Sequence, residues 1–258
     1  MAENKFPTEV IELPSKGWFY PTESPLSKGE LEIKYMTAKE EDILTSRNLL
    51  RKGIAIDMAL RSLVVTPIDY DSLLIGDKNA LMVACRVLAY GKEYPVDISC
   101  PSCGKKHHEI VDLTALEHKE VPTEESMRGV NEFEFELPHA KRKLTFKLLC
   151  GNDEKEIAQE LESVKKMKKN SQVNEELSTR LKRMILSVDG KSDRKTIYEF
   201  VENEFLSIDS LSFRQHVRKV QPDVDLSFGF ECPNEECGYS EELLIPLTSE
   251  FFWPTGRG

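Results

Sequence analysis

Four cysteines in two matching motifs constrain the fold of this chain more than any other feature. The first motif, CPSCG, contains Cys100 and Cys103, and the second, CPNEECG, contains Cys232 and Cys237. In both motifs a proline after the first cysteine favours a tight turn, and a glycine after the second can adopt the positive backbone angle that reverses the chain. We therefore expect each motif to form a turn that directs two thiols toward one point.

Short alternating or apolar runs flank both motifs and predict strands. YPVDIS and HHEIVDL surround the first motif, and VDLSFGFE and SEELLIPL surround the second. Each motif would then cap a β-hairpin, and two hairpins that share one ion form a zinc ribbon, here split by residues 104 to 231. Four thiolates leave no open coordination position, which is typical of structural zinc. We expect one Zn²⁺ per chain, bound by Cys100, Cys103, Cys232 and Cys237.

Two details of the motifs bear on this prediction. The second spacing is CxxxxC, two residues longer than the first, which could loosen the turn without preventing ligation. His107 and His108 lie close enough to replace a ligand, but four thiolates already complete the shell, so we interpret both as ordinary polar strand residues. The alternative is a set of reduced, metal-free cysteines, which leaves the repeated prolines and glycines unexplained. Cys85 and Cys150 are interpreted as small buried hydrophobic residues.

The first segment, residues 1–35, contains four prolines and three adjacent aromatic residues, Trp18, Phe19 and Tyr20. A segment of this composition does not form a core alone, so we expect an extended N-terminal arm. The arm either crosses the body or a neighbouring subunit and offers its aromatic side chains to a partner, or packs on its own domain.

A helical part is expected at residues 36–95. Thr37 and Glu40 form a T-x-x-E capping box that predicts the start of a helix through TAKEEDILTSRNLLRK, which Gly53 would end. A second helix is expected near Ile54 to Val64. Asp77 is expected to cap a third, strongly apolar helix, KNALMVACRVLAY, which should be buried at the centre.

The remaining segments complete an α+β prediction: a helical domain around the split zinc ribbon, with an inserted lobe of a β-hairpin and helices. FEFEL and KLTFKLL alternate with period two and predict the hairpin. An apolar stripe from Val173 through Ile185 to Val188 predicts one of the helices that follow. The expected boundaries are 96–116 and 224–250 for the ribbon halves, 130–222 for the inserted lobe and 251–258 for a C-terminal tail that folds back on the ribbon or inserts into a partner.

Composition narrows the classes of function. A net charge of −10 repels phosphate backbones and disfavours non-specific nucleic-acid binding. The basic segment from Lys165 to Lys195 is a local exception, interpreted as a solvated helix face and linker, with a docking patch for an acidic partner as the alternative. No run of about 18 to 20 apolar residues predicts a membrane span, and the N-terminal residues do not resemble a signal peptide, so we expect a cytosolic protein.

Motifs of common enzymes are missing from the sequence. It contains no glycine-rich phosphate loop, no GxSxG elbow, no HExxH motif and no dinucleotide fingerprint. None of the five histidines has an evident nucleophile beside it, and a hydrolase would need a second, open metal position. We therefore expect a protein without enzymatic activity.

Several strings of the sequence resemble one protein family. They are PTEVIELPSKGWFYP, MTAKEEDIL, GDKNALMVACRVLAYG, FKLLCGNDEKEI, LSVDG and PDVDLSF, together with the two cysteine motifs and the closing FFWP. They are similar to the baseplate hub subunit and hub assembly protein family of T-even-like, contractile-tailed bacteriophages. The resemblance extends from about Phe6 to Pro254, which is almost the whole chain.

The resemblance implies a late phage protein that builds the baseplate hub, on which the tape-measure protein and tail tube assemble. It implies a non-enzymatic assembly or scaffold role with baseplate hub and tape-measure proteins as partners, and leaves homo-oligomers open. The location would be the host cytoplasm, with the tail baseplate of the virion as a further possibility. The motif cysteines match the family residue by residue, so the metal assignment carries over.

A zinc-ribbon protein that binds nucleic acid in phage transcription or packaging is the alternative function. Such a protein needs a basic ribbon, whereas the second motif continues as PNEECGYSEE and is acidic. Contact between this acidic surface and phosphate would be costly, which makes nucleic acid the weaker candidate partner.

Overall fold

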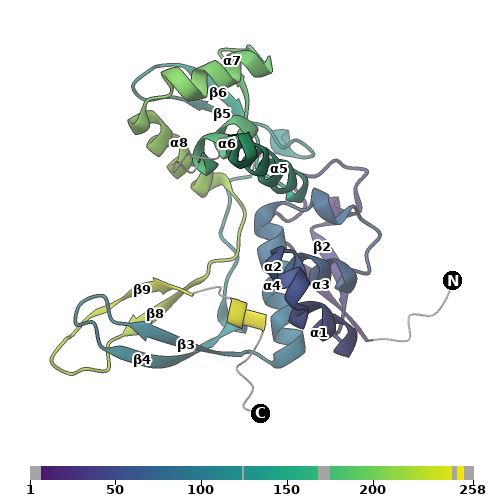
Figure 1. The fold of residues 1–258 in the computed structure, drawn as a ribbon, viewed down its shortest axis with the longest axis vertical. Helices are drawn as coiled ribbons and strands as arrows, with labels where there is room; N and C mark the ends of the chain where they lie inside the picture. The colour runs from purple at the N-terminus through teal and green to yellow at the C-terminus, as the bar shows by residue number, and fades with distance from the viewer. Residues whose placement is uncertain (1–6, 124, 168–174, 246–248, 253–258) are drawn as a thin grey trace.

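Helices and short antiparallel sheets alternate along the chain and form three connected parts (Figure 1). The computed structural model describes residues 7–123, 125–167, 175–245 and 249–252. We call the three parts the helical part (7–92), the double hairpin (93–116 with 224–245) and the lobe (130–222). This combination of helices and antiparallel strands confirms the predicted α+β class.

The helical part joins one β-hairpin to four helices. Thr37 and Glu40 form the predicted capping box, in which the Glu40 carboxylate accepts hydrogen bonds from the Thr37 backbone N–H at 3.0 Å and from its hydroxyl at 2.6 Å. The single helix predicted after Thr37 is wrong, because the extended backbone of Ser46 divides it in two. The elements are β1 (Thr8–Glu12), β2 (Glu30–Lys34), α1 (Ala38–Thr45), α2 (Arg47–Arg51), α3 (Ala55–Leu63) and α4 (Ile75–Tyr90).

Residues 7–34 pack against the helices of the helical part instead of forming an extended arm. Strand β1 pairs with β2, and Phe19 and Tyr20 between them are 2% and 4% exposed. Both rings belong to the main hydrophobic core, while Trp18 is half-buried and packs against it. The described part of this segment therefore follows the second of the two alternatives, packing on its own domain.

A buried hydrogen-bond network holds this N-terminal segment against α4. The Tyr20 hydroxyl donates to Asp77 Oδ2 at 2.5 Å and accepts from the Leu74 backbone N–H at 2.9 Å. The Ser15 backbone N–H donates to Asp77 Oδ1 at 3.0 Å. Asp77 was expected to cap α4, but the helix begins two residues earlier, at Ile75, so this prediction is wrong. The carboxylate instead binds the loop between β1 and β2.

Replacing Tyr20 with phenylalanine is expected to lower the free energy of unfolding by about 1–3 kcal/mol, because two buried polar groups would each lose a hydrogen-bond partner. Urea unfolding measures the change. Tyr35→Phe is the matched control, since the Tyr35 hydroxyl donates to Glu9 Oε1 at the exposed surface. No measurable change is expected for the control, and equal losses in both variants would contradict the role given to the buried network.

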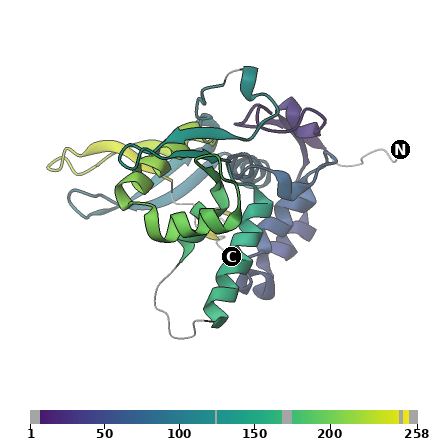
Figure 2. The same cartoon turned by 90° about the horizontal axis from the view of Figure 1, so that it is seen from above.

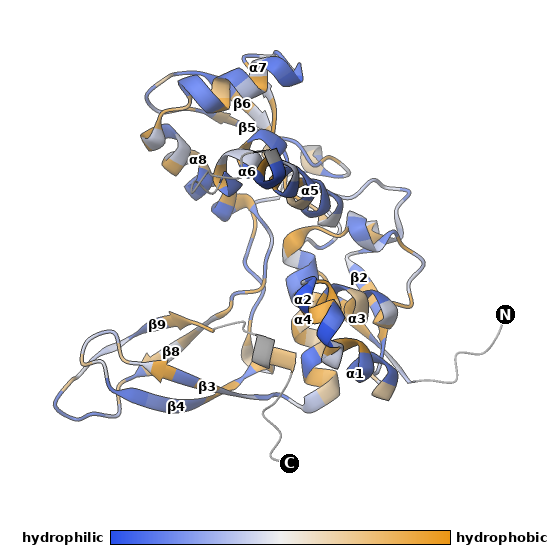
Figure 3. Ribbon diagram, viewed as in Figure 1, coloured by the Kyte–Doolittle hydropathy of each residue, from blue (hydrophilic) through white to orange (hydrophobic). Residues whose placement is uncertain are grey.

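One hydrophobic core extends through all three parts of the molecule. Leu81 of α4, Tyr94 of the double hairpin and Phe146 of the lobe belong to the same cluster of buried side chains. Figure 3 shows hydrophobic residues along α3 and α4, and mostly hydrophilic residues on α5 of the lobe. Among the described residues, no helix combines the length and the apolar composition that a membrane span requires.

The double hairpin projects away from the helical part. Both hairpins point in the same direction in two perpendicular views, so they lie side by side (Figures 1 and 2). Each cysteine motif joins the two strands of one hairpin, as the alternating runs predict. The strands are β3 (Glu93–Ser99) paired with β4 (Lys106–Asp112), and β8 (Ser227–Glu231) paired with β9 (Ser240–Leu244).

The lobe contains a three-stranded sheet covered by helices. The predicted hairpin is confirmed, but a third strand pairs with it where the sequence predicts a helix through Ile185 and Val188. Both side chains are buried in that strand; Val173, expected in the same stripe, lies outside the described residues. The elements are β5 (Phe133–Glu136), β6 (Lys143–Phe146), β7 (Ile185–Val188), α5 (Gly151–Met167), α6 (Glu176–Met184), α7 (Arg194–Glu199), a π-helical turn (Phe200–Glu204) and α8 (Ser207–Val220).

The chain joins the double hairpin to the lobe through two linkers, around residues 117–119 and 222–225, and these linkers pair with each other. His118 and Val224 form an antiparallel bridge. The Lys119 N–H donates to the Asp223 carbonyl at 2.9 Å, and the Asp225 N–H donates to the Glu117 carbonyl at 2.8 Å. The chain therefore enters and leaves the lobe at neighbouring positions.

The described C-terminal residues fold back on the double hairpin. Phe251 and Phe252, in a short 3₁₀ turn (Ser249–Phe252), are each 1% exposed. The Phe251 ring lies 5.1 Å from the Tyr94 ring, centroid to centroid, in an edge-to-face arrangement. Of the two outcomes expected for the tail, these residues follow the first.

Candidate metal centre

The turn between β3 and β4 places the first pair of thiols. The Cys100 backbone N–H donates to the Lys105 carbonyl at 2.9 Å, and the Gly104 N–H donates to the Cys100 carbonyl at 2.8 Å. Gly104 has φ of 71°, as predicted for the residue after the second cysteine. No atom lies within 4 Å of a Cβ built on it, so glycine is favoured here by the backbone angle and not by crowding.

The turn between β8 and β9 repeats this arrangement despite its longer spacing. The Cys232 N–H donates to the Tyr239 carbonyl at 2.8 Å, and Gly238 has φ of 61°. The two additional residues are absorbed by a turn in which the Cys237 N–H donates to the Asn234 carbonyl at 2.8 Å. The longer spacing therefore does not displace the second thiol from the site.

The four predicted cysteines converge at the tip of the double hairpin. Their Sγ atoms all lie within 4.8 Å of one another. The contacts cross between the hairpins: Cys100 Sγ is 3.8 Å from Cys237 Sγ, and Cys103 Sγ is 3.8 Å from Cys232 Sγ. These separations are well beyond a disulfide bond of about 2.05 Å, and all four cysteines are free. A third link crosses the tip, where Lys105 Nζ donates to Asn234 Oδ1 at 3.0 Å.

This donor set fits a tetrahedral metal ion. A Zn–S bond of about 2.3 Å places the sulfur corners of a tetrahedral site about 3.8 Å apart, which matches both measured sulfur pairs. Thiolates are soft ligands that favour zinc and other thiophilic metals over magnesium or calcium. The Cys100 side chain is buried, whereas Cys103 is exposed, so the cluster lies at the protein surface with one side toward solvent.

The surroundings of the cluster shift the pKa of two of its thiols in opposite directions. A hydrogen bond with the Ser102 side chain and another from the Tyr239 backbone lower the pKa of Cys237 to about 7. Desolvation, followed by hydrogen bonds with the other cysteines, raises the pKa of Cys232 to about 12. A dication would lower the pKa of every coordinating thiol, because the thiolate is the form that binds metal.

His107 lies beside the cluster, as its place in the sequence indicates, although it was interpreted as an ordinary polar strand residue without a contact to a cysteine. Its Nε2 is 3.5 Å from Cys232 Sγ, and its ring lies 5.9 Å from that of the buried Phe230. His108 points elsewhere and contacts Asp97 Oδ1 through Nδ1 at 2.9 Å. Strand alternation was the signal that could have separated the two histidines, because adjacent residues of a strand face opposite sides.

The basic segment forms ion pairs within the lobe. Arg180 makes two hydrogen bonds to the Glu154 carboxylate, at 2.6 and 2.8 Å. Arg183 Nε donates to the buried Asp153 at 2.9 Å. Lys182 Nζ donates to a Glu202 oxygen at 2.6 Å. These cations therefore belong to a helix face that is neutralised within the lobe, and they do not form a free docking patch. Residues 168–174 of the basic segment lie outside the described ranges.

Comparison with known protein families gives a match over most of the chain. The chain matches the family model described as T4 bacteriophage base plate protein over residues 18–253, which includes all four cysteines of the cluster. Searches among curated proteins and among solved structures found no match.

Proposed function

The chain belongs to the T4 bacteriophage base plate protein family, and from this membership we propose that it is a zinc-stabilised, non-enzymatic assembly protein of the baseplate hub. The convergence of Cys100, Cys103, Cys232 and Cys237 carries the proposal. These residues come from hairpins that precede and follow the lobe in sequence. One ion bound to them would fix the lobe relative to the helical part and present both to other baseplate proteins.

Zinc is proposed because the four side chains that converge on one point in the described part of the chain are all cysteines. When bound, zinc would supply a redox-inert cross-link between the two hairpin turns. The protein supplies the rest: two glycines with positive φ reverse the chain, and backbone hydrogen bonds close each turn around its sulfur atoms. With all four positions taken by cysteines, no position is left for substrate or water, which favours a structural over a catalytic role.

Family membership supports partners among baseplate proteins and a location in the phage tail. Within that range we propose the hub and tape-measure proteins as direct partners. Four aromatic residues of the two terminal segments are unsuitable as the contact surface, because Phe19, Tyr20, Phe251 and Phe252 are buried in the chain itself. The partner surface therefore has to lie on the exposed parts of the fold.

Genetic complementation tests the proposed function directly. A phage that lacks this protein would be grown in cells supplying the wild-type chain, Cys103→Ser or Cys150→Ser. Cys150 is a free cysteine outside the cluster and serves as the matched control. We expect the wild type and Cys150→Ser to restore hubs and infectious particles, and Cys103→Ser to leave tails without complete baseplates in electron micrographs. Normal baseplates with Cys103→Ser would contradict the role of the thiolate cluster in assembly.

Mass spectrometry of purified particles, compared with infected-cell lysate, tests the proposed location. A stoichiometric signal in the particles is expected for a component of the tail. A protein found in lysate and lacking from the particles would instead be an assembly factor that leaves before maturation.

His107→Gln is expected to lower the affinity for zinc by about 10- to 100-fold, the usual effect of losing a group that contacts a metal ligand, and so to speed the release of zinc to a chelating dye. The reason is the contact between His107 Nε2 and Cys232 Sγ at 3.5 Å. His108→Gln is the matched control, because His108 contacts Asp97 and not the cluster. Equal release rates for both variants would show that His107 does not support the metal ligand.

A further inference from the structure

Strand β1 has one edge without a strand partner. The Leu13 N–H donates to the Gly29 carbonyl at 2.8 Å, so the odd-numbered residues of β1 bond to β2. Backbone groups in an antiparallel strand alternate in direction, which turns the N–H and C=O groups of Val10 and Glu12 away from β2. No backbone hydrogen bond joins Val10 or Glu12 to another described residue outside the β1–β2 ladder.

The opposite edge of this small sheet is already occupied. The Glu32 N–H donates to Thr66 Oγ1 at 2.8 Å, and the Val65 N–H donates to the Glu32 carbonyl at 2.9 Å. An isolated bridge between Ile33 and Val64 continues this pairing. Within the described part of the sheet, β1 is thus the edge at which a further strand could be added.

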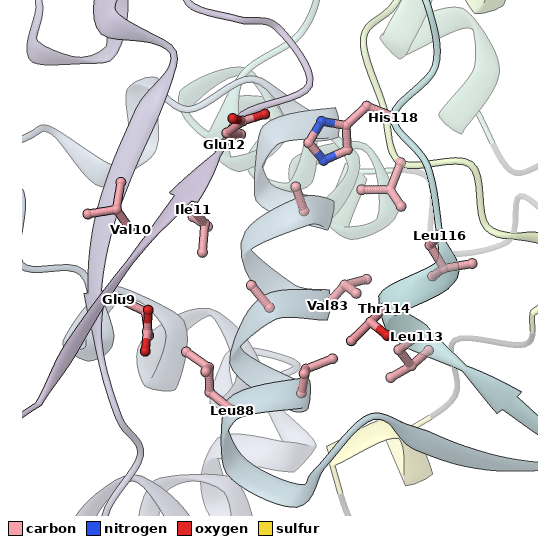
Figure 4. Close-up of a pocket in the computed structure, with 14 residues that line it drawn as sticks. Glu9, Val10, Ile11, Glu12, Val83, Leu88, Leu113, Thr114, Leu116 and His118 are labelled. Carbon is pink, nitrogen blue, oxygen red and sulfur yellow. The ribbon is translucent and has the colours of Figure 1, made fainter.

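An apolar groove runs along this free edge (Figure 4). It has a volume of about 350 Å³, and Glu9, Val10, Ile11 and Glu12 line one side of it, whereas no residue of β2 does. Leu113 and Leu116 form part of the opposite side. The floor is a stripe of small and aliphatic side chains on α4, made of Ala80, Val83, Ala84, Val87 and Leu88.

The shape of the groove favours an extended segment over a helix. Its volume lies near the lower end of ligand sites, which is enough for a few side chains but not for a helix about 10 Å wide. A helix would also leave the outward N–H and C=O groups of Val10 and Glu12 unused, because it satisfies its own backbone. A strand added to β1 would use these groups and place every second side chain over the floor.

The charges at the groove favour a basic segment. Glu9 and Glu12 are both exposed and line the groove, and His118 is the one other titratable side chain there. No lysine or arginine is among the described residues that line it. Val10 between the two glutamates is 61% exposed, so the edge is open to a partner.

We propose that this groove binds an extended segment of a partner protein, which adds a strand to β1, places alternate aliphatic side chains over α4 and pairs flanking lysine or arginine residues with Glu9 and Glu12. The binding surface uses none of the four cysteines. Its test is therefore independent of the metal and of the proposed role in the hub.

A synthetic peptide tests the proposal on the full chain. The probe contains three consecutive valine–threonine pairs with two lysines at each end. It carries a fluorophore, so that binding can be measured by fluorescence anisotropy. We expect saturable binding, at least tenfold weaker binding of the same peptide with glutamates in place of the lysines, and at least tenfold slower amide exchange at Val10 and Glu12 in the complex.

Two variants at one position isolate the backbone contact. Val10→Pro removes the outward N–H without removing a hydrogen bond to β2, and proline is tolerated at strand edges. Val10→Ala keeps the N–H and loses only the exposed side chain. Val10→Pro should weaken peptide binding at least tenfold and Val10→Ala less than threefold, with unchanged melting curves. Should Val10→Pro melt earlier, Ala84→Leu, which fills the floor, is expected to give the same loss of binding.

Three outcomes would overturn the proposal. They are no saturable binding of the lysine-flanked peptide, equal binding of the lysine and glutamate peptides, and equal binding by Val10→Pro and Val10→Ala. Sedimentation of the protein without peptide tests whether a second copy of the chain occupies the groove instead. Concentration-dependent dimers in which the Val10 and Glu12 amides are protected would assign the groove to a second copy of the chain and not to a basic partner.

Discussion

Cys100→Ser is expected to abolish stoichiometric metal binding and to lower the melting temperature by about 10 °C or more. Structural zinc contributes about 10–16 kcal/mol to folding in small zinc-binding peptides, and about a third of that free energy would produce such a shift in a chain of this size. The effect should extend beyond the tip, because Tyr94, Val96 and Val111 of the same hairpin belong to the main core. Elemental analysis and differential scanning calorimetry measure both quantities.

The control for this prediction is Cys150→Ser. The Cys150 thiol is half-buried and donates to Asp153 Oδ2 at 3.3 Å, a hydrogen bond that a serine hydroxyl can also make. The Cys150→Ser variant should retain one metal ion per chain and have a melting temperature close to that of the wild type. A strong chelator should lower the melting temperature of the wild type to that of Cys100→Ser and leave the latter unchanged. A wild-type melting curve that does not respond to complete removal of the metal would contradict the proposed stabilisation.

Gly76→Ala is expected to lower the free energy of unfolding by about 3 kcal/mol or more and the melting temperature by about 6 to 12 °C. Gly76 is in the first turn of α4, where the linker from the lobe passes directly over it. A Cβ at this position would overlap the Pro222 carbonyl oxygen and lie 2.7 Å from the Pro222 carbonyl carbon. Both atoms belong to the backbone, so rotation of a side chain cannot relieve the clash.

Gly229→Ala is the matched control for the glycine prediction. Gly229 is in strand β8, has a negative φ and has no atom within 4 Å of a built Cβ. Alanine restricts the unfolded chain more than glycine does, so this variant should be neutral or stabilised by up to about 1 kcal/mol. Thermal unfolding measures both variants. Similar decreases in melting temperature for Gly76→Ala and Gly229→Ala would show that the contact between α4 and the linker does not limit stability.

The cysteine cluster could be predicted from the sequence because its determinants are local. Each turn depends on a proline and a glycine within the motif, and each strand on alternation in the residues beside it. Convergence of the two turns followed from the chemistry of four thiols, although the motifs are far apart in the chain. Proximity to the motif did not distinguish His107 from His108, because the contact with Cys232 depends on which face of β4 is turned toward the second hairpin.

The errors occurred where distant contacts outweigh local pattern. Ile185 and Val188 have helical spacing with the residues before them, but pairing with β6 makes them a strand. Asp77 has the residue type of a helix cap, yet Tyr20 and Ser15 bury its carboxylate. None of these partners is close in the sequence to the residue that it contacts. Periodicity and capping preference therefore could not reveal the contacts.

The pairing of the two linkers has a consequence for how proteins of this architecture can diversify. Because Lys119 and Asp223 are hydrogen-bonded neighbours, the two chain ends of the lobe meet at one place. The lobe also packs directly on the helical part, where Leu74 forms an antiparallel bridge with Cys150. An insertion whose ends meet in this way can change in length on its outer face, while the face that packs on the scaffold keeps its geometry. The double hairpin and the helical part would then be the shared frame, and the outer face of the lobe the place where variation accumulates.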